Sequence, residues 1–186
     1  MNRYIAFDVE SGGTTTDTSL LTAYFQVLDH ELNAMDECNI IAKPNDGKYV
    51  ITAQGMDVNK INIIEHDKIA TSYSQCGQTL RSFLQKNSNS GKIKLISIGK
   101  NIEFDINFVT AHLLNRANWN YFVSYRSLEV TSLAMAAQIS NKLPAGLSLS
   151  LGSLAAHFKI IVPGSAHEAK YDTLITVEVL KKLMAL

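Results

Sequence analysis

The sequence has few cysteines, no long apolar run and no excess of charge. Cys38 and Cys76 are the only cysteines among its 186 residues, and they form neither a metal-type pair nor a disulfide scaffold. The apolar run that starts MNRYIAF is interrupted at Asp8, so it is too short for a secretory signal, and no later stretch is long enough to span a bilayer. We therefore expect a cytoplasmic protein without membrane contact.

The charge balance limits how the chain can meet nucleic acid. It has 17 basic and 17 acidic side chains, and its formal net charge is zero. This balance excludes the basic tail or stripe of a strong non-specific nucleic-acid binder, and contact with a polyanion has to be local. A neutral chain can still be a nucleic-acid enzyme, because four acids occupied by divalent metal would leave 17 basic against 13 acidic residues.

Length and patterning predict one α/β domain over residues 1–186, without repeats. Five apolar runs predict strands, namely RYIAFDVE, LLTAYFQVLD, ELNAMDECNIIAK, KIKLISIG and NYFVSYRSLEV. Helical spacing predicts helices within residues 70–89, 101–116, 131–143, 153–158 and 167–186, whereas residues 44–68 predict an irregular wrapping segment. Three successive strands followed by alternating helices and strands predict a mixed five-stranded sheet flanked by helices.

Acidic side chains follow two of these strands. In FDVESGG, Asp8 and Glu10 are two residues apart on a strand, so both point to one side while Phe7 and Val9 face the core. Such a pair is costly without a cation, although a solvated acidic turn is the commoner meaning of this stretch alone.

A third acid stands in the segment GKNIEFD. Asn101 is the expected N-cap of a helix there, and Asp105 lies one turn later at the mouth of the fourth strand. An acid in a first turn also complements the helix dipole, and that is the favoured interpretation of Asp105 in isolation.

His167 and Asp172 come near the end of the chain, in HEAKYD. On an unbroken helix they would be roughly 140° apart and could not line one groove. If residues 163–165 instead keep His167 in the loop ahead of the helix, its imidazole can lie over Asp172. A lone histidine ahead of a helix is otherwise more often a cap or a surface residue.

Together, FDVES, GKNIEFDINF and HEAKYD resemble the three motifs of the DEDDh family of 3′-to-5′ exonucleases, which have a ribonuclease H-like fold and include proofreading subunits, ribonuclease T and oligoribonucleases. The resemblance spans almost the whole chain in the family's order. Two departures concern substrate preference: Ser11-Gly12-Gly13 stands where Thr-Thr-Gly is frequent, and Lys100 where histidine commonly precedes the asparagine.

The resemblance implies a two-metal-ion hydrolase that releases nucleoside 5′-monophosphates. Asp8, Glu10, Asp105 and Asp172 would hold two Mg²⁺ or Mn²⁺ ions through oxygen ligands, and His167 would take the proton of the attacking water. Because histidine changes charge near neutral pH, it suits that role.

Substrate contacts and partners are less sharply defined. Residues expected to touch the terminal nucleotide are Ser11, Gly12, Gly13, Asn101 and Phe104, although Phe104 is equally expected in the core. The partner is the 3′ end of single-stranded DNA or RNA, and the sequence does not choose between the two. A homodimer and a polymerase partner are open alternatives, since small members of the family are often dimers.

Two rival functions share the expected fold. The first is a binding module for nucleic-acid ends or a polymerase, with little turnover, which would have no reason to keep all four acids and the histidine. The second is a ribonuclease H-type endonuclease, which would not need the His-x-Ala-x-x-Asp arrangement. An exonuclease should require a free 3′ end, so cleavage of a circular substrate would exclude it.

Overall fold

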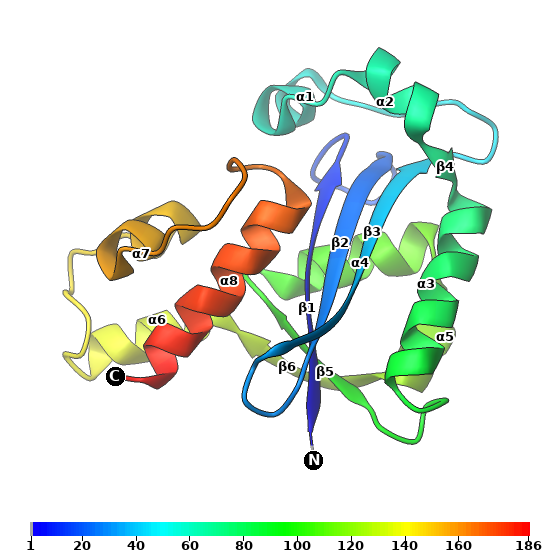
Figure 1. The fold of residues 1–186 in the computed structure, drawn as a ribbon. Coiled ribbons are helices and arrows are strands. Elements are labelled where there is room, and N and C mark those ends of the chain that lie inside the picture. Colours follow the sequence, from blue (N-terminus) through cyan, green and yellow to red (C-terminus); the bar gives the residue numbers. More distant parts are fainter. Residues whose placement is uncertain (1) are drawn as a thin grey trace.

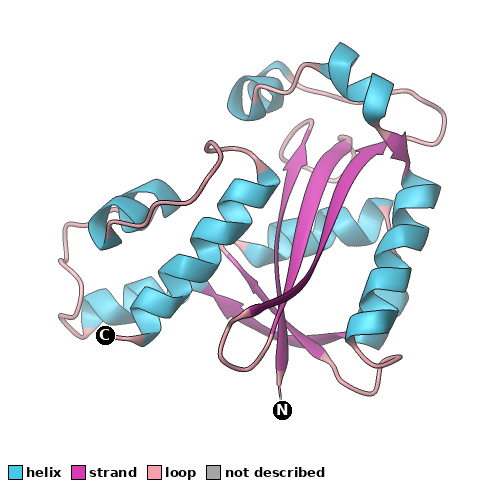
Figure 2. Ribbon diagram, in the orientation of Figure 1, coloured by secondary structure: helices cyan, strands magenta, loops and turns pink. Residues whose placement is uncertain are grey.

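The computed structural model describes residues 2–186, which form a central mixed sheet with helices on both faces (Figures 1 and 2). The strand order is β4-β3-β2-β1-β5-β6. Antiparallel pairing joins β1 to β2 and β2 to β3, and the remaining neighbours are parallel. The strands are β1 (Arg3–Ser11), β2 (Leu20–Leu28), β3 (Ala34–Lys43), β4 (Thr71–Ser72), β5 (Leu95–Gly99) and β6 (Val123–Glu129).

The predicted fold class is confirmed, with one more strand than expected. The additional strand, β4, is two residues long and pairs with the end of β3 just before the first long helix. Its sequence, Thr-Ser, has no apolar alternation that could have distinguished it from the N-terminal cap of that helix. Ser72 indeed caps the helix as well, since its side chain accepts a hydrogen bond from the backbone N–H of Gln75.

The helices agree with the expected ones except in two places. The wrapping segment contains two short helices, each begun by a side-chain cap from Thr52 or Asn62. A further helix precedes β6, where the sequence predicted only the start of a strand, and buries Trp119. The helices are α1 (Ala53–Asn59), α2 (Ile63–Ile69), α3 (Tyr73–Asn87), α4 (Ile102–His112), α5 (Arg116–Phe122), α6 (Val130–Ile139), α7 (Leu151–Phe158) and α8 (Ala169–Met184).

Two apolar cores cover the two faces of the sheet. Helices α3, α4 and α5 pack on one face around Phe7, Phe25 and Trp119, and α6, α7 and α8 pack on the other (Figure 1). The alternation along β1 sends Phe7 and Val9 into the first core, as predicted. None of the helices within residues 2–186 is both long and apolar enough to cross a membrane.

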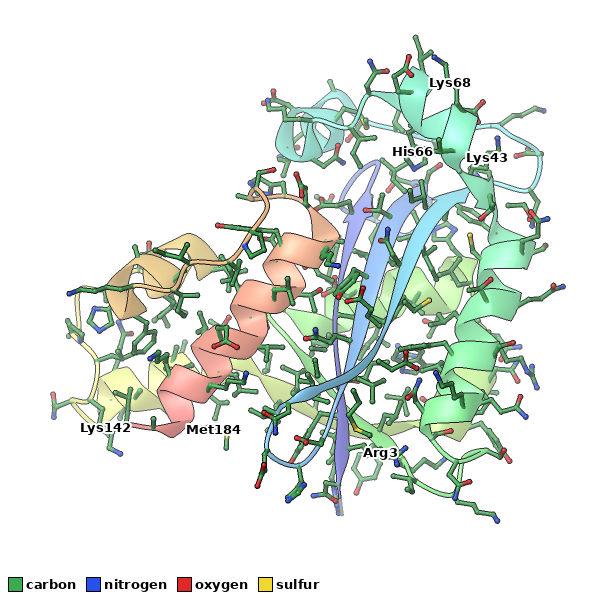
Figure 3. The ribbon with its side chains drawn as sticks, viewed as in Figure 1. Arg3, Lys43, His66, Lys68, Lys142 and Met184 are labelled. Atoms are coloured by element: carbon green, nitrogen blue, oxygen red, sulfur yellow. The ribbon has the colours of Figure 1, made fainter. Side chains whose placement is uncertain are left out.

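The segment with α1 and α2 lies across the ends of the strands, at the top of Figure 1. It is tied to the sheet by His66 of α2, which is buried and whose Nε2 lies 3.0 Å from the backbone oxygen of Leu21 (Figure 3). This end of the sheet is where β1, β5 and β6 terminate, and open α/β sheets bind ligands at the carboxyl ends of their strands.

Candidate active site

The acidic pair of β1 lies at the carboxyl end of that strand, between its two neighbours. Asp8 and Glu10 stand opposite Tyr24 and Thr22 of β2, and the pairing register shifts directly after Glu10. Glu10 is only 8% exposed, so its carboxylate is held within the structure and not in a solvated turn. The solvated-turn alternative does not fit this burial.

Asp105 reaches the same strand from the other side of the sheet. It lies in the first turn of α4, is 3% exposed, and its Oδ1 accepts a hydrogen bond from the backbone N–H of Val9 at 3.0 Å. That bond places the Asp105 carboxylate between Asp8 and Glu10 along β1. A residue that only complemented the helix dipole would be exposed to solvent, and Asp105 is buried.

His167 lies in the loop ahead of α8, which begins at Ala169. Its backbone is in the left-handed region with φ 65°, and its N–H donates to Asp172 Oδ2 at 3.1 Å. This turn lets His167 in the loop and Asp172 in the first turn of α8 face the same place. The arrangement is the one predicted for a His167 that lies ahead of the helix. Ligand atoms of Glu10, His167 and Asp172 all lie within 4.8 Å of one another.

Burial and mutual repulsion perturb the acids strongly. Burial, then the charges of Asp8 and Asp172, raise the pKa of Glu10 to about 9. Burial also raises the pKa of Asp8 well above its usual range, with a contribution from Asp172, while nearby Lys100 opposes the rise. The pKa of Asp105 rises for the same main reason, followed by the charge of Asp8, and that of Asp172 rises through burial.

Shifts of this kind are typical of carboxylates that together bind a cation. The charges of Asp8 and Asp172 raise the pKa values of neighbouring acids, and adjacent buried carboxylates gain little from their proximity unless a positive charge joins them. Lys100 lowers the pKa values of two of them, Asp8 and Asp172, and His167 lowers that of Asp172. The donors are oxygen atoms with one imidazole nitrogen beside them, and such a set fits hard divalent cations.

The glycine turn after β1 is packed tightly against the start of α1. The backbone oxygen of Gly12 accepts hydrogen bonds from both the N–H and the hydroxyl of Thr52, at 2.6 and 3.0 Å. A Cβ on Gly12 would come within 2.6 Å of the Val50 oxygen, and one on Gly55 within 2.4 Å of the Gly12 oxygen. Gly12 is therefore explained by packing within the protein.

A pocket of about 180 Å³ opens beside this turn and Glu10. Of the predicted substrate-binding residues, Ser11, Gly13 and Phe104 line it. Phe104 also packs against Phe108 and the adjoining core, which confirms the packing role, and its contact with a nucleotide stays a prediction. Val58 of α1 lines the same pocket.

Asn101 occupies the expected N-cap position of α4 but does not cap it. Its backbone is left-handed, with φ 57°, and its side chain accepts no hydrogen bond from the helix. The predicted N-cap position is thus confirmed without a capping bond from the side chain, and Asn101 lines a different pocket beside Lys100.

Two supporting residues carried no sequence signal. Glu129, at the end of β6, accepts from the backbone N–H of Asn101 at 2.8 Å and of Ser132 at 2.8 Å, which joins the ends of β5 and β6. Asn59, at the end of α1, is buried; its amide donates to the Ser11 oxygen at 2.9 Å, and its own oxygen accepts from the Ile61 N–H. Both contacts join segments distant in sequence, and no local pattern predicts them.

Comparison of whole structures finds the fold among known nucleases. A scan against protein-family models gives no match, and a search of curated proteins gives none either. The zinc-bound form of the E. coli exonuclease I complex with single-stranded DNA is similar over 100% of this chain, with a TM-score of 0.79 and 16% identity. The E. coli exonuclease I complex with a dT13 oligonucleotide covers 98% of this chain, with a TM-score of 0.78 and 16% identity.

A third neighbour comes from another organism and agrees with these two. Exonuclease I of Methylocaldum szegediense covers 99% of this chain, with a TM-score of 0.74 and 16% identity. The chain spans about two fifths of each neighbour's length, namely 41%, 41% and 40%. At this identity the likeness concerns the fold, and this chain therefore has a ribonuclease H-like fold of the kind found in exonuclease I.

Proposed function

We propose that the protein is a metal-dependent 3′-to-5′ exonuclease that removes nucleoside 5′-monophosphates from single-stranded nucleic acid. The observation that carries this proposal is the group formed by Glu10, His167 and Asp172, whose ligand atoms lie within 4.8 Å of one another at the carboxyl end of β1. It brings a proton acceptor to a cluster of buried and partly buried carboxylates, and that pairing is what water-driven phosphodiester cleavage requires.

Asp8, Glu10, Asp105 and Asp172 would hold the divalent cations, Mg²⁺ or Mn²⁺. Bound there, the cations would lower the pKa of a water molecule and neutralise the phosphate. Asp105 keeps its oxygen in place through the Val9 N–H, and Asp172 does so through the His167 N–H. Both carboxylates are thus oriented before any substrate binds, which reduces the cost of assembling the site.

His167 would take the proton of the attacking water. Its side chain is exposed, so the proton can pass on to solvent, and its ring faces two of the carboxylates. The left-handed turn at His167 fixes the backbone from which the ring extends. A binding module would have no use for an exposed base held in this position.

The terminal nucleoside would occupy the pocket lined by Ser11, Gly13, Val58 and Phe104. The aromatic ring of Phe104 offers a stacking surface for a base of any sequence. Single-stranded DNA is the substrate to test first, because the structural neighbours include exonuclease I bound to dT13 and to a dA13 oligonucleotide. RNA is the second substrate to test. If both are hydrolysed, a comparison of their kcat/KM values would give the sugar preference.

The test follows a 5′-labelled single strand, as DNA and as RNA, with Mg²⁺, Mn²⁺ or EDTA. The expected result is stepwise, metal-dependent shortening by wild type and none by Asp8→Asn. Matched circular DNA should stay intact. Cleavage of the circle would replace the proposal with an endonuclease, and intact linear strands under every metal condition would replace it with a binding module.

A further inference from the structure

Different side chains line the pockets on the two sides of β1 at the candidate active site. On the side of β2 and β3, His167 and Glu168 line a pocket of about 380 Å³ together with Thr22 and Asn39. On the side of β5 and β6, Lys100 and Asn101 open into a separate pocket of about 530 Å³. Thus the base proposed above and Lys100 lie on opposite flanks of the strand that bears Asp8.

In-line displacement at phosphorus places the attacking water and the leaving oxygen on opposite sides. If His167 serves the water on the β2 flank, the leaving 3′ oxygen and the rest of the strand depart on the β5 flank. That flank is the one with Lys100, whose charge acts on both Asp8 and Asp172.

The pocket at Lys100 continues into another of about 350 Å³ further along the edge of the sheet. The two share Glu103 and Ser127 in their walls, and we call them together the β6 groove. Its far part is lined by Ser97, Arg116, Ser124 and Tyr125, and it opens where the pairing of β5 with β6 loses its regular register.

Three features of the far part suit a nucleic-acid strand. Tyr125 is 88% exposed, and the guanidinium of Arg126 lies 5.5 Å from the centre of its ring. The Ser97 hydroxyl is fully buried and, within residues 2–186, has no hydrogen-bond partner. Arg116 adds a second guanidinium to this wall.

The acids of the groove are already engaged within the protein. Glu103 forms an ion pair with Arg116 at 3.0 Å, and Glu129 accepts from the backbone N–H groups of Asn101 and Ser132. Arg116 is thus paired with Glu103, and Lys100 and Arg126 are the basic groups of this edge that form no ion pair within residues 2–186. A neutral chain can make a local contact with a polyanion in this way.

The geometry points to the β6 groove as the site that binds the nucleotides 5′ of the scissile phosphate, with one base stacked on Tyr125 and the backbone beside Arg116 and Arg126. This inference rests on the proposed function, since it takes the direction of the strand from the position of His167. It adds a binding surface for the retained strand, distinct from the pocket of the terminal nucleoside.

The test compares a dinucleotide, which reaches only the near end of the groove, with a single-stranded 12-mer. Tyr125→Ala should raise KM for the 12-mer by about fivefold or more, as expected for one lost base stack, without changing kcat or dinucleotide hydrolysis. Arg126→Gln should lower the slope of log KM against log salt by about 0.7, the contribution of one single-strand phosphate contact. Tyr121→Ala is the control, because Tyr121 is an exposed tyrosine beside Lys94 that lines neither part of the groove.

Equal effects of Tyr125→Ala on both substrates, or none on either, would overturn the inference while leaving the exonuclease intact. If wild type cleaves neither substrate, the proposed function fails, and the same variants are then compared by anisotropy of a fluorescein-labelled 12-mer. If Tyr125→Ala then binds the 12-mer more weakly than Tyr121→Ala, the β6 groove binds the strand even without catalysis. Equal binding by the two variants would contradict the inference.

Discussion

The backbone N–H of Val9 donates to the Asp105 carboxylate across 96 positions of sequence and joins β1 to the first turn of α4. The bond gives one carboxylate oxygen a structural role and leaves the other for the proposed binding of a cation. A substitution that removes the negative charge of Asp105 but keeps its acceptor oxygen should therefore lower activity without lowering stability.

Asp105→Asn should keep the fold and lose activity. The amide oxygen can still accept from Val9, and removal of the charge relieves repulsion with Asp8, so the metal-free variant should unfold at the same temperature as wild type or higher. Asp105→Ala should be less stable than Asp105→Asn by about 1–3 kcal/mol, because the Val9 N–H is left buried and unpaired. Equal thermal midpoints of the two variants in EDTA would show that the bond contributes nothing.

The acid cluster makes a specific prediction for pH. The pKa of Glu10 is about 9 in the folded chain, against 4.5 ordinarily, so between these values the folded chain holds a proton that the unfolded chain has lost. The stabilisation is complete below about pH 4.5 and is lost as pH rises toward 9. In EDTA, the free energy of unfolding in urea should therefore fall between pH 6 and pH 8.5.

Divalent cation should reverse this trend, because it binds the deprotonated carboxylates and only in the folded chain. Mg²⁺ or Mn²⁺ should raise the unfolding midpoint more at pH 8.5 than at pH 6. Glu10→Gln is the control: it should flatten the pH dependence in EDTA and weaken the response to metal. A cluster that responds to neither pH nor metal would not be a cation site.

The sequence could predict those parts of the fold and site that depend on a local pattern of residues. Asp8 and Glu10 share a strand face by alternation alone, and the five expected strands are all present. The helices α1, α2 and α5 were missed because each is seven residues long, too short for helical periodicity to show. Asn59 and Glu129 act through contacts with distant segments, at the Ser11 oxygen and the Asn101 N–H, and such contacts become visible only in the fold.

Removal of the His167 side chain should affect the chemical step more than folding. The residue is exposed and ahead of α8, and its bond to Asp172 is made by the backbone N–H, which alanine retains. His167→Ala should lower the single-turnover rate by about 10²- to 10⁴-fold, the usual contribution of a general base, with little change in the thermal midpoint. His157→Ala, another exposed histidine, on α7, is the matched control and should have normal activity. A large change in KM with an unchanged rate would assign His167 to substrate binding.

The close approach of α1 to the glycine turn predicts that Gly55 is sensitive to a single methyl group. A Cβ at Gly55 would lie 2.4 Å from the backbone oxygen of Gly12, and neither main chain can yield without moving Glu10 or the pocket beside it. Gly55→Ala should therefore lower stability and raise KM for a single strand. Gly152→Ala is the control, because Gly152 lies in α7 with open space around its Cβ position, and alanine there should stabilise by about 0.5–1 kcal/mol. If both variants gain stability and keep the wild-type KM, the contact between α1 and the turn does not shape the substrate pocket.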